Sequence, residues 1–169
     1  PVTQDLFLVA EDQAVLRHHL LHEHVLDEVR ALVRIQLVER GELVGRFKLE
    51  RPAFHAVALT TDTSILTAIG NDYGFDAVFA RQVEGLGAAG DVLLAYSTSG
   101  NSPNVLKAIE MARQRGMKAV GFTGPDGGAM AGLCDVCIKA PGEDTPTVQE
   151  CHTAAGHTIC RFVERMLCT

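Results

Sequence analysis

A short polar segment, residues 97–102, combines several hydroxyl side chains with a glycine. The apolar run 91–96 before it is typical of a buried strand, and Pro103 followed by apolar residues at helical spacing predicts a helix after it. At such a turn, free backbone N–H groups and the positive helix end attract an anion, and hydroxyls add further donors. The sequence therefore predicts a phosphate site formed by Ser97, Thr98, Ser99 and Ser102.

Other features of the sequence limit which class of anion this segment could bind. The segment lacks the lysine of the GxxxxGK[ST] pattern, which argues against a nucleoside triphosphate, and a sugar phosphate fits better. The net charge of −6 argues against nucleic acid as the main ligand, because a protein that binds a phosphate backbone needs a basic face. A loop that only caps the following helix is the alternative, although one cap needs only one hydroxyl.

The elements that must position this segment alternate along the chain. Apolar runs bounded by turn residues predict strands at 55–59, 91–96, 118–122 and 136–139. Helices are expected at about 4–36, 63–69, 79–86, 103–115, 126–133 and 146–168. Strands that alternate with helices predict an α/β fold, a three-layer, doubly wound parallel sheet flanked by helices. Ligands of such sheets bind at the carboxyl ends of the strands, where residues 97–102 lie.

Length and composition bound the class of protein. The 169 residues are 47% hydrophobic, so we expect one domain over 1–169, with an N-terminal helical segment at 1–36 and an α/β core at 37–169. We expect no membrane span and no signal segment. Five cysteines are an odd number in a chain of this size, which favours the reducing cytoplasm. The CxxC pair, Cys134 and Cys137, has no second pair and is expected to be buried rather than to bind zinc.

A family resemblance covers about three quarters of the chain, from residue 41 to the C-terminus. The matching segments occur in order and at family-like spacing: Gly41–Phe47, Leu59–Ser64, Gly70–Gly74, Ser97–Asn104, Gly121–Gly124 with Gly127–Gly128, and Gln149–His152 with Gly156–His157. Together they resemble the SIS domain, and specifically the bacterial phosphoheptose isomerases. The serine segment alone would indicate only a phosphosugar-binding SIS domain, and the positions of Glu42 and His157 narrow the resemblance.

The resemblance implies an aldose–ketose isomerase that converts sedoheptulose 7-phosphate to D-glycero-D-manno-heptose 7-phosphate through an enediol. The product would feed the heptose of lipopolysaccharide cores or of other surface glycans. By the match, Glu42 would be the base and His157 its acid–base partner. Thr61 and Asp62 would hold sugar hydroxyls, and Gln149 would contact substrate or metal.

The resemblance also carries expectations about assembly. Family members form tetramers with active sites between subunits, so a homotetramer is implied. The N-terminal helix carries an apolar stripe that it could bury against another subunit, which suggests a role in oligomerisation.

The chain departs from the family ahead of Glu42. Family members carry an additional strand and a glycine-rich loop there, and neither is recognisable in this sequence. Either the chain lacks the loop, or its residues belong between Gln36 and Gly41 and are absent from this sequence. The family's metal-binding histidine, four residues before the glutamate, is Val38 here. The resemblance implies a zinc ion at Glu42, Gln149 and His157, although one carboxylate, one amide and one imidazole hold zinc poorly.

A second function from another class is weighed against the enzyme. Adaptors of the SIS fold that bind the replication initiator DnaA resemble phosphoheptose isomerases and keep a serine-bearing loop. They lack the glutamate and the histidine at the catalytic positions. Because Glu42 and His157 are both present, the sequence favours the enzyme.

Overall fold

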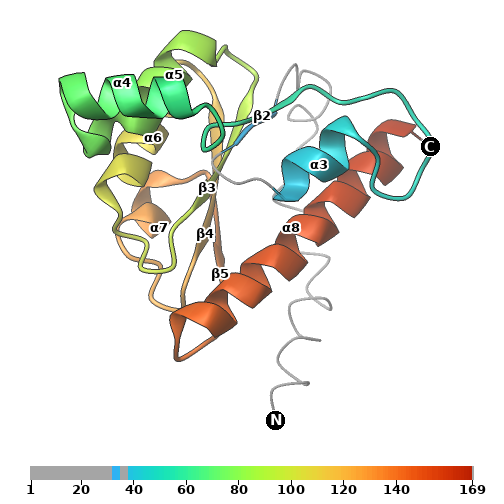
Figure 1. The fold of residues 1–169 in the computed structure, drawn as a ribbon. Helices are drawn as coiled ribbons and strands as arrows, with labels where there is room; N and C mark the ends of the chain where they lie inside the picture. Colours follow the sequence, from blue (N-terminus) through green and yellow to red (C-terminus); the bar gives the residue numbers. More distant parts are fainter. Residues whose placement is uncertain (1–31, 35–37, 169) are drawn as a thin grey trace.

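The strands of this chain form one parallel sheet (Figure 1), in a computed structural model that describes residues 32–34 and 38–168. The strands are β1 (Leu32–Arg34), β2 (Ala56–Ala58), β3 (Val92–Tyr96), β4 (Lys118–Thr123) and β5 (Val136–Lys139). Their spatial order is β2-β1-β3-β4-β5, and all neighbours run parallel. Because the chain moves to one side of β1 for β2 and to the other side for β3, the strand order reverses at β1. Sheets of this kind bind ligands at that reversal.

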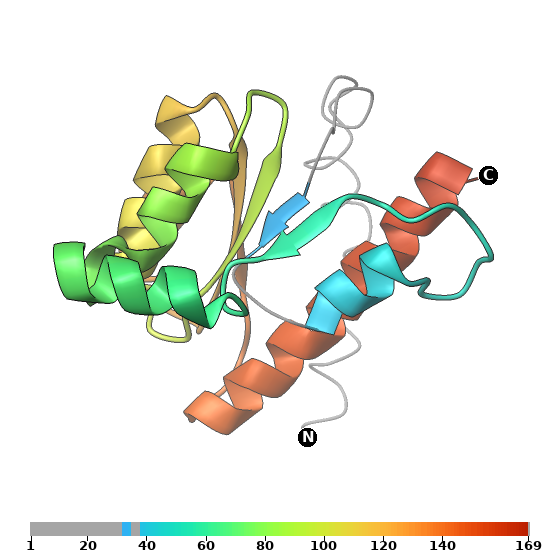
Figure 2. The ribbon, with the colours of Figure 1, turned by 45° about the horizontal axis from the view of Figure 1, so that its top comes forward.

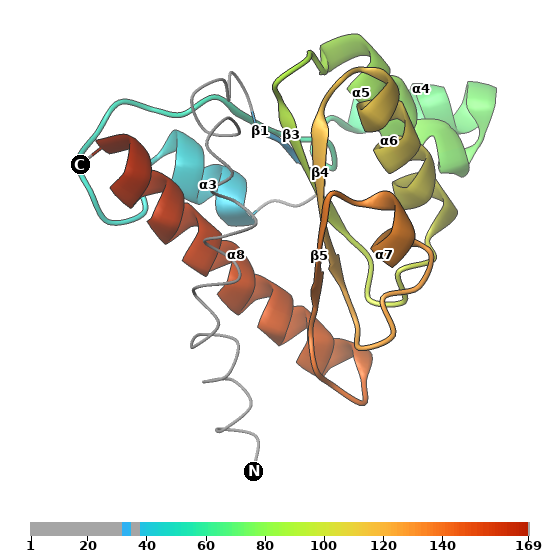
Figure 3. The ribbon, with the colours of Figure 1, turned by 180° about the vertical axis from the view of Figure 1, so that it is seen from behind.

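Helices cover both faces of the sheet, which gives the three layers expected from the sequence (Figures 1 and 3). The helices on one face are α4 (Thr63–Tyr73), the 3-10 helix η1 (Phe75–Ala77), α5 (Val78–Leu86), α6 (Pro103–Gln114) and α7 (Met130–Leu133). The helices on the other face are α3 (Val38–Val44) and α8 (Thr145–Cys168).

The side chains of β3 alternate between these two layers. Leu93 and Ala95 belong to the core formed with α5 and α6, whereas Leu94 and Tyr96 belong to the core formed with α3 and α8. Every residue of β3 is buried. A strand covered on both faces has no polar side, which explains why its sequence is a continuous apolar run.

The N-terminal part of the sheet corrects the sequence-based prediction. Leu32–Arg34, expected inside a helix over 4–36, forms β1 and pairs with both β2 and β3. The position between two parallel strands satisfies backbone groups on both sides, and this outweighs a local helical pattern. A short central strand therefore does precede Glu42. The rest of the helix expected over 4–36 lies outside the described residues.

The other predicted elements match the structure within one residue at each end, with two exceptions: α7 begins at Met130 rather than at residue 126, and α4 ends later than expected. The helix expected at 63–69 continues as α4 to Tyr73, and the chain turns only at Gly74, whose φ is 82°. Gly70 keeps helical geometry inside α4, so a glycine there does not end the helix. Within residues 32–34 and 38–168, no helix is both long enough and apolar enough to cross a membrane.

Candidate active site

The hydroxyl groups of the serine segment converge between β3 and α6. Ser97 Oγ lies 2.9 Å from Ser102 Oγ and 3.4 Å from Ser99 Oγ. Ser99 Oγ also accepts a hydrogen bond from the Asn101 N–H at 3.2 Å. Ser97 is buried and Ser99 is exposed, so the group extends from the sheet edge to solvent. The structure thus brings three of the four predicted phosphate-binding hydroxyls together, with Thr98 between them in the same turn.

The start of α6 shows that this segment does more than cap a helix. Ser102 occupies the N-cap position, but its side chain forms no cap hydrogen bond and contacts Ser97 instead. Pro103 follows at the first turn. A cap would direct the Ser102 hydroxyl to an N–H group of that turn. The cap-only alternative is therefore wrong for Ser102, and the positive end of α6 faces the serine group.

A second loop, residues 124–128 after β4, packs against the serine segment. The Gly124 N–H donates a hydrogen bond to Thr98 O at 2.9 Å. Gly100 has a φ of 66° and packs so closely on this loop that a Cβ atom would collide with the Gly127 carbonyl oxygen. Only glycine meets both conditions, because it tolerates positive φ and has no side chain. Residues 97–102 and the loop 124–128 are therefore packed together through their backbones.

Thr61 and Asp62 follow β2 at the same edge of the sheet. The Thr61 hydroxyl donates to Ala58 O at 2.9 Å. Asp62 is the N-cap of α4, and its Oδ1 accepts from the Ile65 N–H at 2.9 Å. Both residues are exposed. The structure therefore gives Asp62 a capping role that the sequence reading did not include.

Glu42 lies in the last turn of α3, the short helix between β1 and β2. Its side chain is half-buried, and its backbone carbonyl accepts from Arg51 Nη2 at 2.8 Å. The next residue, Leu43, is buried in a core that includes Ala155 and Ile159 of α8. Glu42 therefore belongs to a helix that packs along α8, as Figure 2 shows.

His157 lies on α8 where α3 approaches it. The Phe47 ring, just after α3, has its centroid 5.6 Å from that of the His157 ring. At the preceding residue, Gly156, a Cβ atom would collide with the carboxylate of Glu39. Because Glu39 lies one helical turn before Glu42, this close approach brings together the helix segments that carry both candidate catalytic residues. The fold thus places Glu42 and His157 on adjacent helices.

A buried polar group behind the serines was missed by sequence reasoning. Glu39, 1% exposed, accepts a hydrogen bond from the Tyr96 hydroxyl at 2.7 Å, which ties α3 to the strand that ends at Ser97. His152 is also buried, and burial lowers its pKa despite a hydrogen bond to Thr123 O and the nearby Glu39 carboxylate. The neutral imidazole donates from Nε2 to Thr123 O at 3.0 Å. Glu39 and Tyr96 are 57 residues apart, so no local pattern signals the pair.

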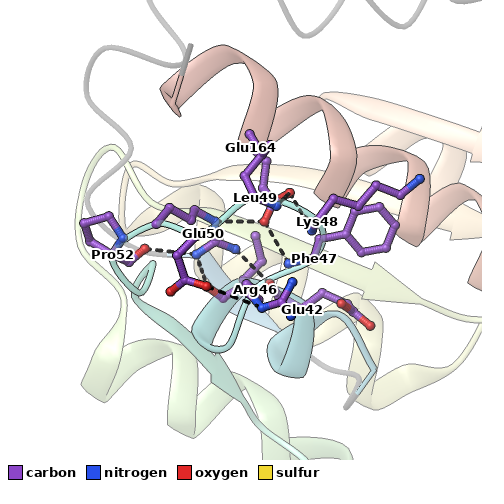
Figure 4. A network of polar contacts seen from close by, with 10 residues as sticks. Glu42, Arg46, Phe47, Lys48, Leu49, Glu50, Pro52 and Glu164 are labelled. Atoms are coloured by element: carbon purple, nitrogen blue, oxygen red, sulfur yellow. Dashed lines mark hydrogen bonds and ion pairs between the residues drawn. The ribbon is translucent and has the colours of Figure 1, made fainter.

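A second missed group joins α8 to the connection after α3 (Figure 4). The Glu164 carboxylate accepts from the backbone N–H groups of Phe47, Lys48 and Leu49 at 2.7, 2.9 and 3.1 Å. It also accepts from Arg51 Nε at 3.0 Å, and the Arg51 and Glu164 side chains are only 1% and 2% exposed. Burial alone would raise the pKa of Glu164, but the three backbone donors and the guanidinium together hold it below its ordinary range.

The residues expected to hold zinc form a weak donor set. Gln149 is exposed near the start of α8, and His157 follows eight residues later. Val38, where the resemblance places a histidine, offers no donor atom. In the part of the chain that the structure describes, no group of three or more His, Cys, Asp or Glu side chains is placed to hold a metal ion. A carboxylate, an imidazole and an amide bind zinc poorly, so these residues do not fit a zinc ion well.

Comparisons with known proteins agree with the fold and with the resemblance. A family model described as the SIS domain matches residues 38–124. A phosphoheptose isomerase of Bradyrhizobium sp. is 64% identical over 127 residues, which are 75% of this chain and 64% of that protein. One of Pelobacter propionicus is 58% identical over 127 residues, which are 67% of its length. This chain therefore spans about two thirds of the length of these relatives.

Solved structures extend the similarity beyond the aligned sequence. The phosphoheptose isomerase GmhA from Neisseria gonorrhoeae is 37% identical, with a TM-score of 0.80, over 95% of this chain and 91% of that one. A phosphoheptose isomerase from Francisella tularensis is 28% identical, with a TM-score of 0.74, over 94% of this chain and 95% of that one.

Proposed function

We propose that this chain, which belongs to the SIS-domain family and within it to the phosphoheptose isomerases, interconverts sedoheptulose 7-phosphate and D-glycero-D-manno-heptose 7-phosphate. The observation that carries the proposal is the crossing of α3 and α8, which brings a helix bearing Glu42 against a helix bearing His157. The Glu39–Tyr96 hydrogen bond ties this crossing to the strand that leads into the serine group. The product would supply heptose for a lipopolysaccharide core or another surface glycan.

The serine group would hold the phosphate of the substrate. Ser97, Ser99 and Ser102 present their hydroxyls together at the positive end of α6, and these groups can donate to phosphate oxygens. In this arrangement Thr61 and Asp62 would contact sugar hydroxyls, because they follow β2 at the same edge of the sheet. Gln149 would contact the substrate from α8.

The reaction moves a carbonyl from C2 to C1, and each proton in it can be assigned to a residue. The Glu42 carboxylate takes the proton from C1 of the ketose while His157 donates a proton to O2, which gives an enediol. His157 then takes the proton from the hydroxyl on C1, and Glu42 returns a proton to C2. A carboxylate suits the carbon proton, and an imidazole suits exchange between two oxygens at neutral pH. Both groups end in their starting protonation states.

Turnover of sedoheptulose 7-phosphate by Glu42→Gln tests this assignment. The amide keeps the shape of the side chain and removes the base, so kcat should fall roughly 10²–10⁴-fold, the usual contribution of general base catalysis. Affinity for the substrate should largely survive, because the phosphate is held by the serines. Glu84→Gln, an exposed change on α5, is the matched control and should leave both quantities unchanged.

Two outcomes would contradict parts of the proposal. Near-normal turnover in Glu42→Gln would remove Glu42 as the base. A wild-type protein that binds sugar phosphate but never turns it over would favour the alternative function, a non-catalytic adaptor of the SIS fold. Loss of substrate affinity in the Ser97→Ala/Ser99→Ala double variant, with each charge-assisted hydrogen bond contributing about 1.5–3 kcal/mol, would separately support the phosphate site.

We also propose a homotetramer in the cytoplasm. Tyr73, the last residue of α4, and Phe75, the first of η1, are 60% and 69% exposed, and such apolar side chains favour coverage by another subunit. The five cysteines are free thiols, which suits a reducing compartment. Light scattering at micromolar concentration should give four times the mass of the chain, and a monomer would count against this assembly.

A further inference from the structure

The helix that carries Glu42 is short, and its end is supported from outside. α3 has seven residues, too few to be stable alone, and the last carbonyls of a helix lack partners within it. Gly41 O accepts from the Gly45 N–H at 2.9 Å. The next two carbonyls go to one side chain: Arg51 Nη2 donates to Glu42 O at 2.8 Å, and Arg51 Nη1 donates to Leu43 O at 2.9 Å.

Arg51 is itself fixed in a single orientation. Its Nε donates to Glu164 Oε1 at 3.0 Å, and both side chains are almost fully buried. Its guanidinium carbon lies 4.0 Å from the centroid of the Phe54 ring, and the Phe54 N–H donates to Leu43 O at 3.1 Å. A planar guanidinium that donates from all three nitrogens cannot rotate without breaking several of these bonds.

Glu164 connects this support to the helix that carries His157. It lies seven residues after His157 on α8, which is about two helical turns and therefore the same face. The residue Phe47 contacts both: its N–H donates to Glu164 at 2.7 Å, and its ring packs beside the His157 ring. Figure 4 shows the connection from α8 through Glu164 to the backbone of Glu42. A continuous set of hydrogen bonds therefore runs from α8 to Glu42.

We propose that Arg51 and Glu164 are positioning residues that set the placement of Glu42 on α3 relative to His157 on α8. The inference rests on the proposed function, because it takes these two residues as the acid–base pair. Arg51 and Glu164 are buried and act through the backbone, so they do not contact the substrate. A displacement of about 1 Å in a reacting group can lower a rate about 10²-fold, so loosening this support should be visible in turnover.

Arg51→Lys is the variant that tests the inference. Lysine keeps a positive charge beside Glu164, but one ammonium cannot bond Glu164, Glu42 O and Leu43 O in the planar geometry of arginine. We expect kcat to fall at least about tenfold while KM stays within about twofold, because the serines hold the phosphate independently. Glu164→Asp, which shortens the side chain by one methylene group, should likewise lower kcat and leave KM nearly unchanged. Circular dichroism checks that both variants are folded.

Hydrogen exchange provides a readout that does not depend on turnover. The amides of Phe47, Lys48 and Leu49 donate to Glu164, and both variants should exchange them faster while the amides of β3 and β4 stay protected. Glu50→Gln is the matched control, because Glu50 lies in the same connection but pairs with Arg46 on the surface, where its side chain is 92% exposed. This control should change neither kcat nor exchange.

The possible results separate the inference from the proposed function. Normal kcat in folded Arg51→Lys and Glu164→Asp would overturn the positioning role. An equal effect on kcat in Glu50→Gln would also overturn it. If the wild-type protein shows no isomerase activity, the proposed function fails, and the hydrogen exchange of residues 47–49 alone then decides whether Glu164 holds this segment. Unchanged exchange in both variants would overturn the inference in either case.

Discussion

Replacing Glu164 by glutamine should destabilise the protein strongly, because the site around this carboxylate contains only donors. Three backbone N–H groups and the Arg51 Nε converge on its two oxygens. In Glu164→Gln, an NH₂ group would replace one of these acceptors and face other donors. Arg51, whose side chain is 1% exposed, would become a buried charge without a counter-charge.

The size of the loss follows from burial. Removing one partner of a buried ion pair costs about 3–5 kcal/mol, whereas an exposed pair contributes about 0–1 kcal/mol. In a chain of this length, 1 kcal/mol lowers Tm by about 2–4 °C, so Glu164→Gln should lower it by about 6–20 °C. The control is Glu50→Gln, which breaks the exposed Arg46–Glu50 pair and should lower Tm by no more than about 4 °C.

The pH dependence gives this prediction a second check. The pKa of Glu164 is lower in the folded protein than in the unfolded chain, so its contribution is complete above the unfolded pKa of about 4.3. It is lost as the pH falls through the folded pKa. We therefore expect urea unfolding between pH 7 and pH 3 to show that the difference in free energy of unfolding between wild type and Glu164→Gln shrinks below about pH 4. The reasoning would be refuted if the two proteins differed by less than about 1 kcal/mol in free energy of unfolding at pH 7. It would also be refuted if that difference were the same at pH 3 as at pH 7.

Three further experiments test other parts of the structure. Gly100→Ala combines a positive φ with a backbone collision, so calorimetric titration should show phosphosugar affinity falling more than about tenfold; retained affinity would contradict the packing of residues 97–102 on the loop 124–128. Burial, with the charges of Cys137 and Asp135, raises the pKa of Cys134 to about 12, so iodoacetamide at pH 8 should label Cys168 and spare Cys134 in peptide mass mapping. Burial lowers the pKa of His152, so stability in urea should decline as the pH drops below about 6.5, and His152→Gln should lack this part of the decline.

The strands that are covered on both faces could be predicted from the sequence. The expected strands 91–96 and 118–122 correspond to β3 and β4 within one residue, because burial on both faces requires an almost unbroken apolar run. β1 could not be predicted in this way. It has only three residues, and its pairing with two neighbouring strands, rather than its own composition, makes it a strand.

The serine segment could also be located from sequence, because its hydroxyls stand together in one turn. Buried polar residues whose hydrogen-bond partners are distant in sequence could not be located in this way. Arg51 and Glu164 are 113 residues apart, and a glutamate on an amphipathic helix looks like any surface residue until the fold buries it. The same holds for Glu39, which reads as the first-turn acid of a short helix and lies buried against Gly156.

The distance between Glu164 and its partners also determines when the site can form during synthesis. At roughly 5–20 residues per second, the ribosome adds Glu164 on the order of 6–20 s after Arg51, which precedes it by 113 residues. During that interval β3 and β4 can pair and α6 can cover one face, since these elements are near neighbours in sequence. The other face of the sheet, with Leu94 and Phe122, is covered by α8, which is synthesised last of these elements. Until α8 is synthesised, the apolar side chains on that face are therefore only partly covered, by α3 with Leu43.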